Sequence, residues 1–190
     1  MSEHFIQGKT FENIDFSKQL FEAEEFEDCQ FIRCNFMQGD LSNILFSKSR
    51  FQECDLSMAK LVKTGFREVE FVQCKMLGMQ FDVCNPFLLS FKFDQCVLNF
   101  SSFYELKIKK TAFVNCKLEE VDFIQTDLSN AIFHQSDLSR AKFEQTKLQG
   151  ADFRQAHNYS IDPEMNGIKG AKFSREGLGG LLDKYGIEVE

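Results

Sequence analysis

Residues 121–145 read VDFIQTDLSNAIFHQSDLSRAKFEQ, which is one five-residue unit repeated five times. Each unit has a small or β-branched residue at its first position and a large apolar residue at its third. A period of five matches neither the α-helix, with 3.6 residues per turn, nor the strand, with a period of two. The backbone must therefore turn by a fixed angle in each unit, so that the large side chains point to one axis. The sequence predicts a solenoid, in which each coil contacts only its neighbours.

The same spacing extends over most of the chain. It forms two series, and the second is two residues out of step with the first. Phenylalanine occurs 23 times and tryptophan is absent, so the predicted core is a stack of phenylalanine rings. The large positions are Phe11, Phe16, Phe21, Phe26, Phe31, Phe36, Leu41, Phe46, Phe51, Leu56, Leu61, Phe66, Phe71, Met76 and Phe81, then Phe93, Leu98, Phe103, Ile108, Phe113, Leu118, Phe123, Leu128, Phe133, Leu138, Phe143, Leu148 and Phe153.

Units such as Cys54-Asp55-Leu56-Ser57, Thr126-Asp127-Leu128-Ser129 and Ser136-Asp137-Leu138-Ser139 carry a closer resemblance. Over residues 6–158 the chain resembles the pentapeptide-repeat family, whose usual unit is A(D/N)LXX. The resemblance implies an all-β fold, a right-handed quadrilateral parallel β-helix with four units per coil. We expect residues 1–173 to form this β-helix, with a register break near 82–92 and an irregular segment at 155–166. Residues 174–190 are expected to form a C-terminal cap.

All seven cysteines fall on the small-residue series, where Ala, Ser or Thr stands in other units. Metal sites favour paired spacings such as C-x-x-C with nearby histidines, and the chain has none. We therefore expect buried structural thiols, because free cysteine packs as a small apolar residue. Reduced thiols, and the absence of a signal peptide or long apolar run, favour a cytoplasmic protein without membrane attachment. The seven are Cys29, Cys34, Cys54, Cys74, Cys84, Cys96 and Cys116.

The register break contains a candidate partner-binding segment, Asn85, Pro86, Phe87 and Leu88. Pro86 stands where a core residue is due, and it lacks the N–H that a strand ladder uses. Two arrangements are open. An exposed loop would present Phe87 or Leu88 to solvent, whereas a kink would pack Phe87 and Leu89 into the core. The sequence favours the kink.

The tail from Ser174 changes period. Ser174 is a candidate helix cap, Gly186 suits a helix end, and the apolar residues between them follow helical spacing. The glycines at 177, 179 and 180 make this α-helix weak, so it needs packing to form. We expect an α-helical cap, and in similar family members such a cap is also a homodimer interface; a monomeric cap is the alternative. The predicted interface residues are Leu178, Leu181, Leu182, Tyr185, Ile187 and Val189.

The net charge of −7 is concentrated at the N-terminal end, where residues 1–30 hold eight acids and two bases. This charge disfavours direct binding to nucleic acid or to an anionic membrane. The acidic segment is either a solvated end or a second partner-binding surface. Its central residues are Glu24, Glu25, Glu27 and Asp28.

The sequence contains no catalytic, metal or cofactor motif, so we expect a binding protein and not an enzyme. The three histidines lie far apart. His157, Ser160 and Asp162 have the residue types of a catalytic triad, but their closeness along the chain does not establish that geometry.

Within the family, residues 66–78, 102–106, 158–166 and 171–174 most resemble the topoisomerase-protecting group, which includes Qnr proteins and immunity factors against albicidin and microcin B17. The resemblance implies a dimeric rod that binds DNA gyrase or topoisomerase IV and relieves its inhibition by a drug or toxin. DNA mimicry by charge is limited, because a dimer carries only −14, twice −7, whereas duplex of its length carries roughly 40 charges. The alternative function is a non-catalytic scaffold for another cytoplasmic partner, favoured by the lack of long projecting loops.

Overall fold

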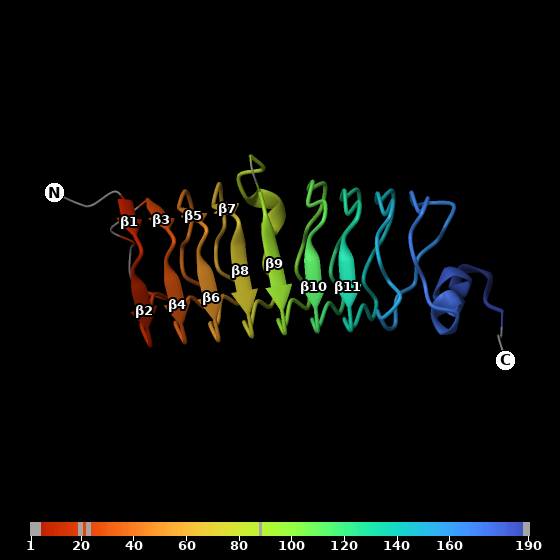
Figure 1. The fold of residues 1–190 in the computed structure, drawn as a ribbon, viewed down its shortest axis with the longest axis horizontal. Coiled ribbons are helices and arrows are strands. Elements are labelled where there is room, and N and C mark those ends of the chain that lie inside the picture. The colour runs from red at the N-terminus through yellow and green to blue at the C-terminus, as the bar shows by residue number, and fades with distance from the viewer. Residues whose placement is uncertain (1–4, 19–20, 22–23, 88, 188–190) are drawn as a thin grey trace.

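A computed structural model of the protein describes residues 5–18, 21, 24–87 and 89–187. The chain winds as a rod of stacked coils, which progress along the long axis from β1 to the C-terminal segment (Figure 1). The strands are short because each side of a coil is only one repeat unit wide. The elements are β1 (Phe5–Gln7), β2 (Thr10–Glu12), β3 (Glu25–Glu27), β4 (Gln30–Ile32), β5 (Leu45–Ser47), β6 (Arg50–Gln52), β7 (Gly65–Arg67), β8 (Val69–Val72), η1 (Phe81–Val83), β9 (Phe91–Asp94), β10 (Ala112–Val114), β11 (Ile132–His134), η2 (Glu176–Leu181) and η3 (Asp183–Tyr185).

All strand pairs are parallel and join one coil to the next. Sheet A has the order β1-β3-β5-β7, and sheet B has the order β11-β10-β9-β8-β6-β4-β2. Phe11 pairs with Phe31, and Phe31 with Phe51, at separations of 20 residues. On the remaining two sides, consecutive coils are joined by isolated parallel bridges, such as that between Asp15 and Asn35. The predicted right-handed, four-sided parallel β-helix is confirmed.

The core is a set of stacked phenylalanine columns. In one column the ring centroids of Phe11 and Phe31 are 5.0 Å apart, and those of Phe31 and Phe51 are 4.6 Å apart. Rings on adjacent sides of a coil meet edge to face, as Phe46 and Phe51 do at 5.2 Å. Each fully buried ring contributes roughly 1.5–3 kcal/mol through burial, and the aromatic geometry adds to this.

The small positions have a second role at the corners. Thr64 Oγ1 donates to the carbonyl of Leu41 at 2.7 Å, and Thr126 Oγ1 donates to that of Phe103 at 2.7 Å. Each carbonyl also accepts a backbone N–H, from Ile44 and Leu106 respectively. The bond therefore satisfies the buried threonine hydroxyl, which would be costly to leave without a partner. The corner residue two places after a large residue commonly adopts a left-handed backbone, as Asn13 and Glu53 do at φ 55°.

The C-terminal segment corrects one prediction. The cap consists of two short 3-10 helices, η2 and η3, and not an α-helix. The glycines permit this tight winding, because Gly177 and Gly180 lie directly against Tyr159. The N-cap of η2 is Arg175 and not the predicted Ser174, although Ser174 Oγ accepts the Gly177 N–H at 3.0 Å. Gly186 ends η3 with a left-handed backbone, as predicted.

In the described part of the chain, no helix is long and apolar enough to cross a membrane.

Candidate partner-binding surfaces

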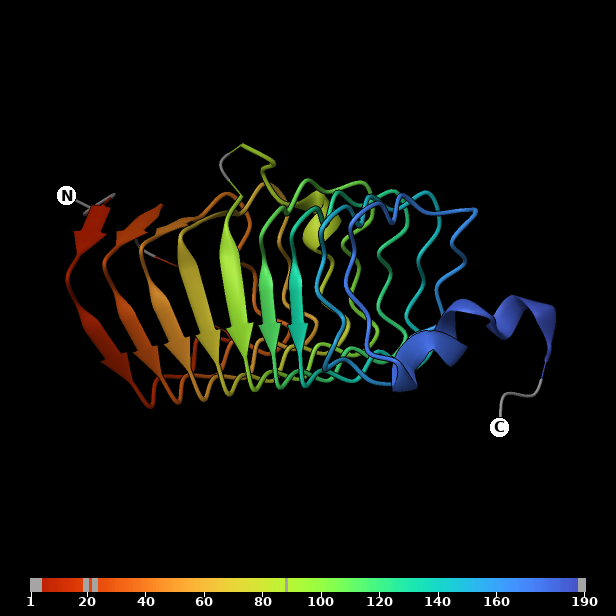
Figure 2. The same ribbon diagram turned by 45° about the vertical axis from the view of Figure 1, so that its right-hand side comes forward.

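The segment between η1 and β9 leaves the solenoid as a projecting loop, residues 84–90 (Figure 2). Asn85 anchors its start, because its N–H donates to the Thr64 carbonyl at 2.9 Å and its Oδ1 accepts the Phe87 N–H at 3.0 Å. Ser90 anchors its end through its N–H, which donates to the Phe66 carbonyl at 2.8 Å. Asn85, Pro86 and Phe87 are exposed, and Phe87 is 73% accessible. Leu88 lies outside the described residues.

The expectation of a kink that packs Phe87 and Leu89 inside is therefore wrong for Phe87. Leu89 is half-buried and packs against the core. The space inside this coil is filled by Phe91, which is 5% accessible and whose ring lies 5.5 Å from Phe81 and 5.1 Å from Phe93. Because Phe91 occupies a position that is small in other coils, the loop is free to turn outward.

The acidic cluster Glu24, Glu25, Glu27 and Asp28 lies at β3, in sheet A. Glu24 and Asp28 are exposed, whereas Glu25 and Glu27 are half-buried. Glu27 is partly neutralised, since its Oε1 lies 3.2 Å from Lys48 Nζ. The cluster is thus a local anionic surface and does not continue along the rod.

The structure brings the loop and the acidic cluster to one side of the rod. Glu25 pairs with Leu45, and Leu45 pairs with Gly65 of β7, the last strand of sheet A. The loop follows where sheet A would continue. Beyond it, the next coil on this side presents Lys107, Lys109 and Lys110, of which Lys109 pairs with Asp127 at 3.3 Å. In order along the rod, this side therefore carries the acidic cluster, the loop with Phe87 and the three lysines.

The predicted dimer residues lie at the opposite end from the acidic cluster. Leu178, Tyr185 and Ile187 are exposed, with 48%, 57% and 56% of their surfaces accessible. Leu181 is partly buried against the core, and Leu182 is half-buried. Val189 lies outside the described residues.

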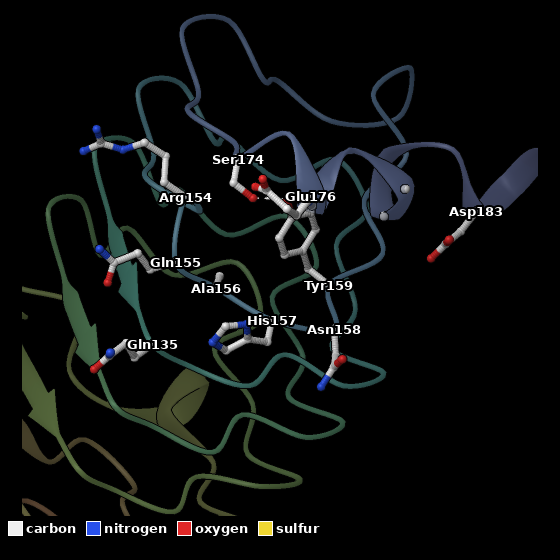
Figure 3. A pocket seen from close by; sticks show the side chains of 13 residues that line it. Gln135, Arg154, Gln155, Ala156, His157, Asn158, Tyr159, Ser174, Glu176 and Asp183 are labelled. Carbon is white, nitrogen blue, oxygen red and sulfur yellow. Dashed lines mark hydrogen bonds between the residues drawn. The ribbon is translucent and has the colours of Figure 1, made fainter. Parts of the chain in front are cut away.

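A cavity of about 880 Å³ lies beside the contact between the last coil and the cap, and both line it (Figure 3). His157 and Tyr159 come from the coil side, and Ser174, Glu176 and Asp183 come from the cap side. The Tyr159 hydroxyl is buried without a hydrogen-bond partner, and burial raises the pKa of Tyr159. The cap is tied down elsewhere, where Lys184 Nζ lies 2.8 Å from Asp162 and 2.7 Å from Glu164.

The candidate triad does not assemble. Asp162 Oδ1 accepts hydrogen bonds from Lys184 and from the Glu164 backbone, and His157 stands in a β-bridge with Asp137. Among the described residues, no group of three or more His, Cys, Asp or Glu side chains is arranged to hold a metal ion.

The prediction of buried thiols is confirmed for all seven cysteines. Five of them form one column along the core, and each thiol contacts a backbone carbonyl, as Cys54 Sγ contacts Phe31 O at 3.3 Å. Burial raises the pKa of Cys74, Cys84 and Cys116. The column is Cys34, Cys54, Cys74, Cys96 and Cys116.

Sequence reasoning missed a set of exposed apolar side chains at the corners of the middle coils. They occupy outward positions of the repeat, and the five-residue spacing identifies only the inward positions that form the core. The signal was present as apolar residues at equivalent corners of neighbouring coils. These residues are Met58, Val62, Val83, Phe100 and Tyr104.

Comparisons with known proteins agree with this geometry. A pentapeptide-repeat family profile, matched as eight copies, covers residues 116–155, and the profile of a pentapeptide repeat region covers residues 6–81. The comparison with curated proteins gave no match.

Several solved structures have the same fold. One is a trypsin-treated variant of QnrB1, a plasmid-mediated fluoroquinolone resistance protein, with a TM-score of 0.66 and 17% identity over 98% of this chain and 100% of that one. A second trypsin-treated QnrB1 variant gives a TM-score of 0.52 and 21% identity over 97% and 99% of the two chains. HetL, a pentapeptide repeat protein involved in heterocyst differentiation regulation from the cyanobacterium Nostoc sp. strain PCC 7120, gives 0.51 and 17% over 91% and 87%. From its repeats, its four-sided coils and these matches, the chain belongs to the pentapeptide-repeat family.

Proposed function

We propose that this protein binds DNA gyrase or topoisomerase IV and protects the enzyme from an inhibitor or toxin. The observation that carries the proposal is the projecting loop with its exposed Phe87, which lies on the same side of the rod as the acidic cluster at β3. The sequence resemblance to the topoisomerase-protecting group supports the choice of partner. The function is that of a binding protein without catalysis, and it places the protein in the cytoplasm, where reduced thiols persist.

Recognition on this side would combine shape with local charge. An exposed aromatic ring is a strong contact residue, because it buries a large area at small entropic cost. The acidic cluster would meet a basic surface of the enzyme, as the DNA backbone does. The lysines at 107, 109 and 110 prevent an anionic stripe from extending along this side of the rod. We therefore propose partial mimicry of DNA, by the shape of the rod and by one acidic end.

We also propose that two chains join through their C-terminal caps. Leu178, Tyr185 and Ile187 expose apolar surface at the end of the rod, and the open end of a solenoid requires cover. A two-fold contact there would leave both loops and both acidic clusters free, so dimerisation is compatible with enzyme binding.

The alternative function is a non-catalytic scaffold for another protein. It would use the same loop, and the loop is short for a topoisomerase-protecting protein. Binding to purified enzyme separates the two functions.

The test is the affinity of the protein for purified gyrase and topoisomerase IV, measured by biolayer interferometry. Phe87→Ala should weaken binding by about tenfold or more. Ile132→Ala, which removes an exposed apolar side chain from sheet B, is the matched control and should leave the affinity unchanged. No binding of the unaltered protein to either enzyme would reject the proposal in favour of the scaffold.

A further inference from the structure

One side of the rod, here called the Lys60 face, has an ordered stripe of outward side chains. Parallel bridges join Asp40 to Lys60, Gln80 to Ser102, Ser102 to Asp122, and Asp122 to Lys142. Among the described residues, none of the four charged side chains takes part in a salt bridge within the chain. In order along the rod, the stripe is Asp40, Lys60, Gln80, Ser102, Asp122 and Lys142.

Both rims of the Lys60 face are apolar near its middle. On one rim, Met58 and Phe100 are both 53% accessible and stand in the coils on either side of Gly78. Gly78 itself has no side chain, and a Cβ there would be in van der Waals contact with Met58 Cγ at 3.6 Å, so Met58 packs beside this glycine. The other rim carries Val62, Val83, Tyr104 and Ile124, of which the first three are exposed.

The charge order of the stripe is self-complementary when it is reversed. A two-fold axis between Gln80 and Ser102 brings Lys60 opposite Asp122 of a second copy and Asp40 opposite Lys142. Every charged position then meets the opposite charge, and the two uncharged positions meet each other. We propose that the Lys60 face binds a second copy of this chain, with the two rods antiparallel and side by side.

The rims fit the same axis. Val62 would face Ile124 of the second copy and Val83 would face Tyr104, so apolar residues meet along one rim. On the other rim, Phe100 would lie opposite Gly78 of the second copy, which has no side chain. The loop at 84–90 follows Val83 and so starts from the rim of Val62 and Val83, near the axis. It carries no charged residue, so the loops of the two copies do not repel each other electrostatically. Parallel rods would instead bring like charges together, which costs several kcal/mol.

The size of the face indicates a dissociable contact. Six coils at ~4.8 Å and a width of five residues at ~3.3 Å give a face of roughly 29 by 16 Å. This is about 450 Å² per copy, well below the ~800 Å² of a standard stable interface. The pairing is distinct from the C-terminal contact proposed above and does not depend on any enzyme partner.

Cysteine crosslinking tests the geometry directly. Lys60 and Asp122 lie three coils apart in one chain, which is about 14 Å and too far for a disulfide. A Lys60→Cys chain mixed with an Asp122→Cys chain should therefore give a disulfide-linked heterodimer under mild oxidation, while neither variant alone should crosslink. Because the native thiols are buried, the unmodified protein should not crosslink and serves as the background control. No heterodimer at high concentration would overturn the proposal, as would efficient crosslinking of Lys60→Cys to itself.

Charge reversal gives a second readout that requires no crosslink. Lys60→Glu creates two like-charge contacts per pair of rods and should raise the lateral dissociation constant by at least about tenfold in sedimentation equilibrium. The Lys60→Glu/Asp122→Lys double variant should restore association. Because both residues are on the surface, circular dichroism should be the same for all variants. Loss of association in the single variant without restoration in the double variant would also contradict the proposal.

Discussion

Val69 of β8 pairs with Phe91 of β9 at a separation of 22 residues, whereas the preceding pairs of the same sheet are 20 residues apart. The two extra residues are absorbed within a single coil. The column of large core residues continues without a gap, because Phe71 pairs with Phe93 in the same two strands and their rings stack at 5.3 Å. The loop is therefore an insertion into an otherwise continuous core, and Phe91 is the side chain that keeps that core closed.

Replacing Phe91 should be far more damaging than replacing Phe87. Phe91→Ala removes a buried ring beside Phe66, Phe81 and Phe93 and should cost about 3–5 kcal/mol of unfolding free energy. Phe87→Ala removes an exposed ring and should change stability by less than about 0.5 kcal/mol. Urea denaturation followed by circular dichroism measures both, and equal effects would show that Phe87 is buried in solution.

The glycines of the cap should differ sharply in their tolerance of a methyl group. A Cβ at Gly180 would lie 2.1 Å from the Tyr159 carbonyl oxygen, whereas one at Gly179 meets nothing within 4 Å. Gly180→Ala should therefore undock the cap, and Gly179→Ala should leave it in place. The Tyr159 ring resonances in NMR spectra report docking, and a docked cap in Gly180→Ala would contradict the packing described here.

The cysteines should be inert in the folded protein. All seven thiols are buried in the core, so a reagent in solvent cannot reach them while the coils stay closed. A thiol reagent at pH 8 should label none of the seven rapidly in the native state and all of them in denaturant. Rapid labelling of one or two thiols without denaturant would identify a coil that opens.

Docking of the cap should depend on pH at both extremes. The Lys184 ammonium lowers the pKa of Asp162 below its ordinary 3.8, so this contribution is present above that value and is lost as the pH falls through the lowered pKa. Asp162 and Glu164 raise the pKa of Lys184 above 10.5, so its contribution is present below 10.5 and is lost as the pH rises through the raised pKa.

Methyl resonances of Leu181, a cap residue that packs against the core, should therefore be constant from about pH 5 to 10 and change outside that range. Lys184→Met should shift them at neutral pH, whereas Lys172→Met, at an exposed lysine of the last coil, should not. A neutral-pH spectrum unchanged by Lys184→Met would show that this ion pair does not hold the cap.

The sequence was sufficient for the solenoid because the five-residue period constrains each residue to face in or out. Phe31 and Cys54 could be placed in the core from spacing alone. The course of residues 84–90 could not be predicted, because the period gives no information where the chain leaves the coil. The unexpected filling by Phe91 decides that course, and it depends on packing between coils.

The cap was also beyond prediction by pattern. Leu178 and Leu181 have helical spacing, but the contacts of Gly177 and Gly180 with Tyr159 select the tighter 3-10 winding. The Lys60 face could be found only in three dimensions, since Lys60 and Asp122 are related by the stacking of coils and not by nearness in sequence.

The proposed protection of a topoisomerase is tested most directly by a supercoiling assay with purified gyrase. The protein is titrated with and without a poison such as a quinolone or albicidin. We predict that supercoiling is rescued, or that less cleaved DNA is trapped, at near-stoichiometric protein, and that Phe87→Ala shifts the rescue to higher concentration while Ile132→Ala does not. No rescue with any poison, together with no effect on gyrase at large excess of the protein, would contradict the proposed function.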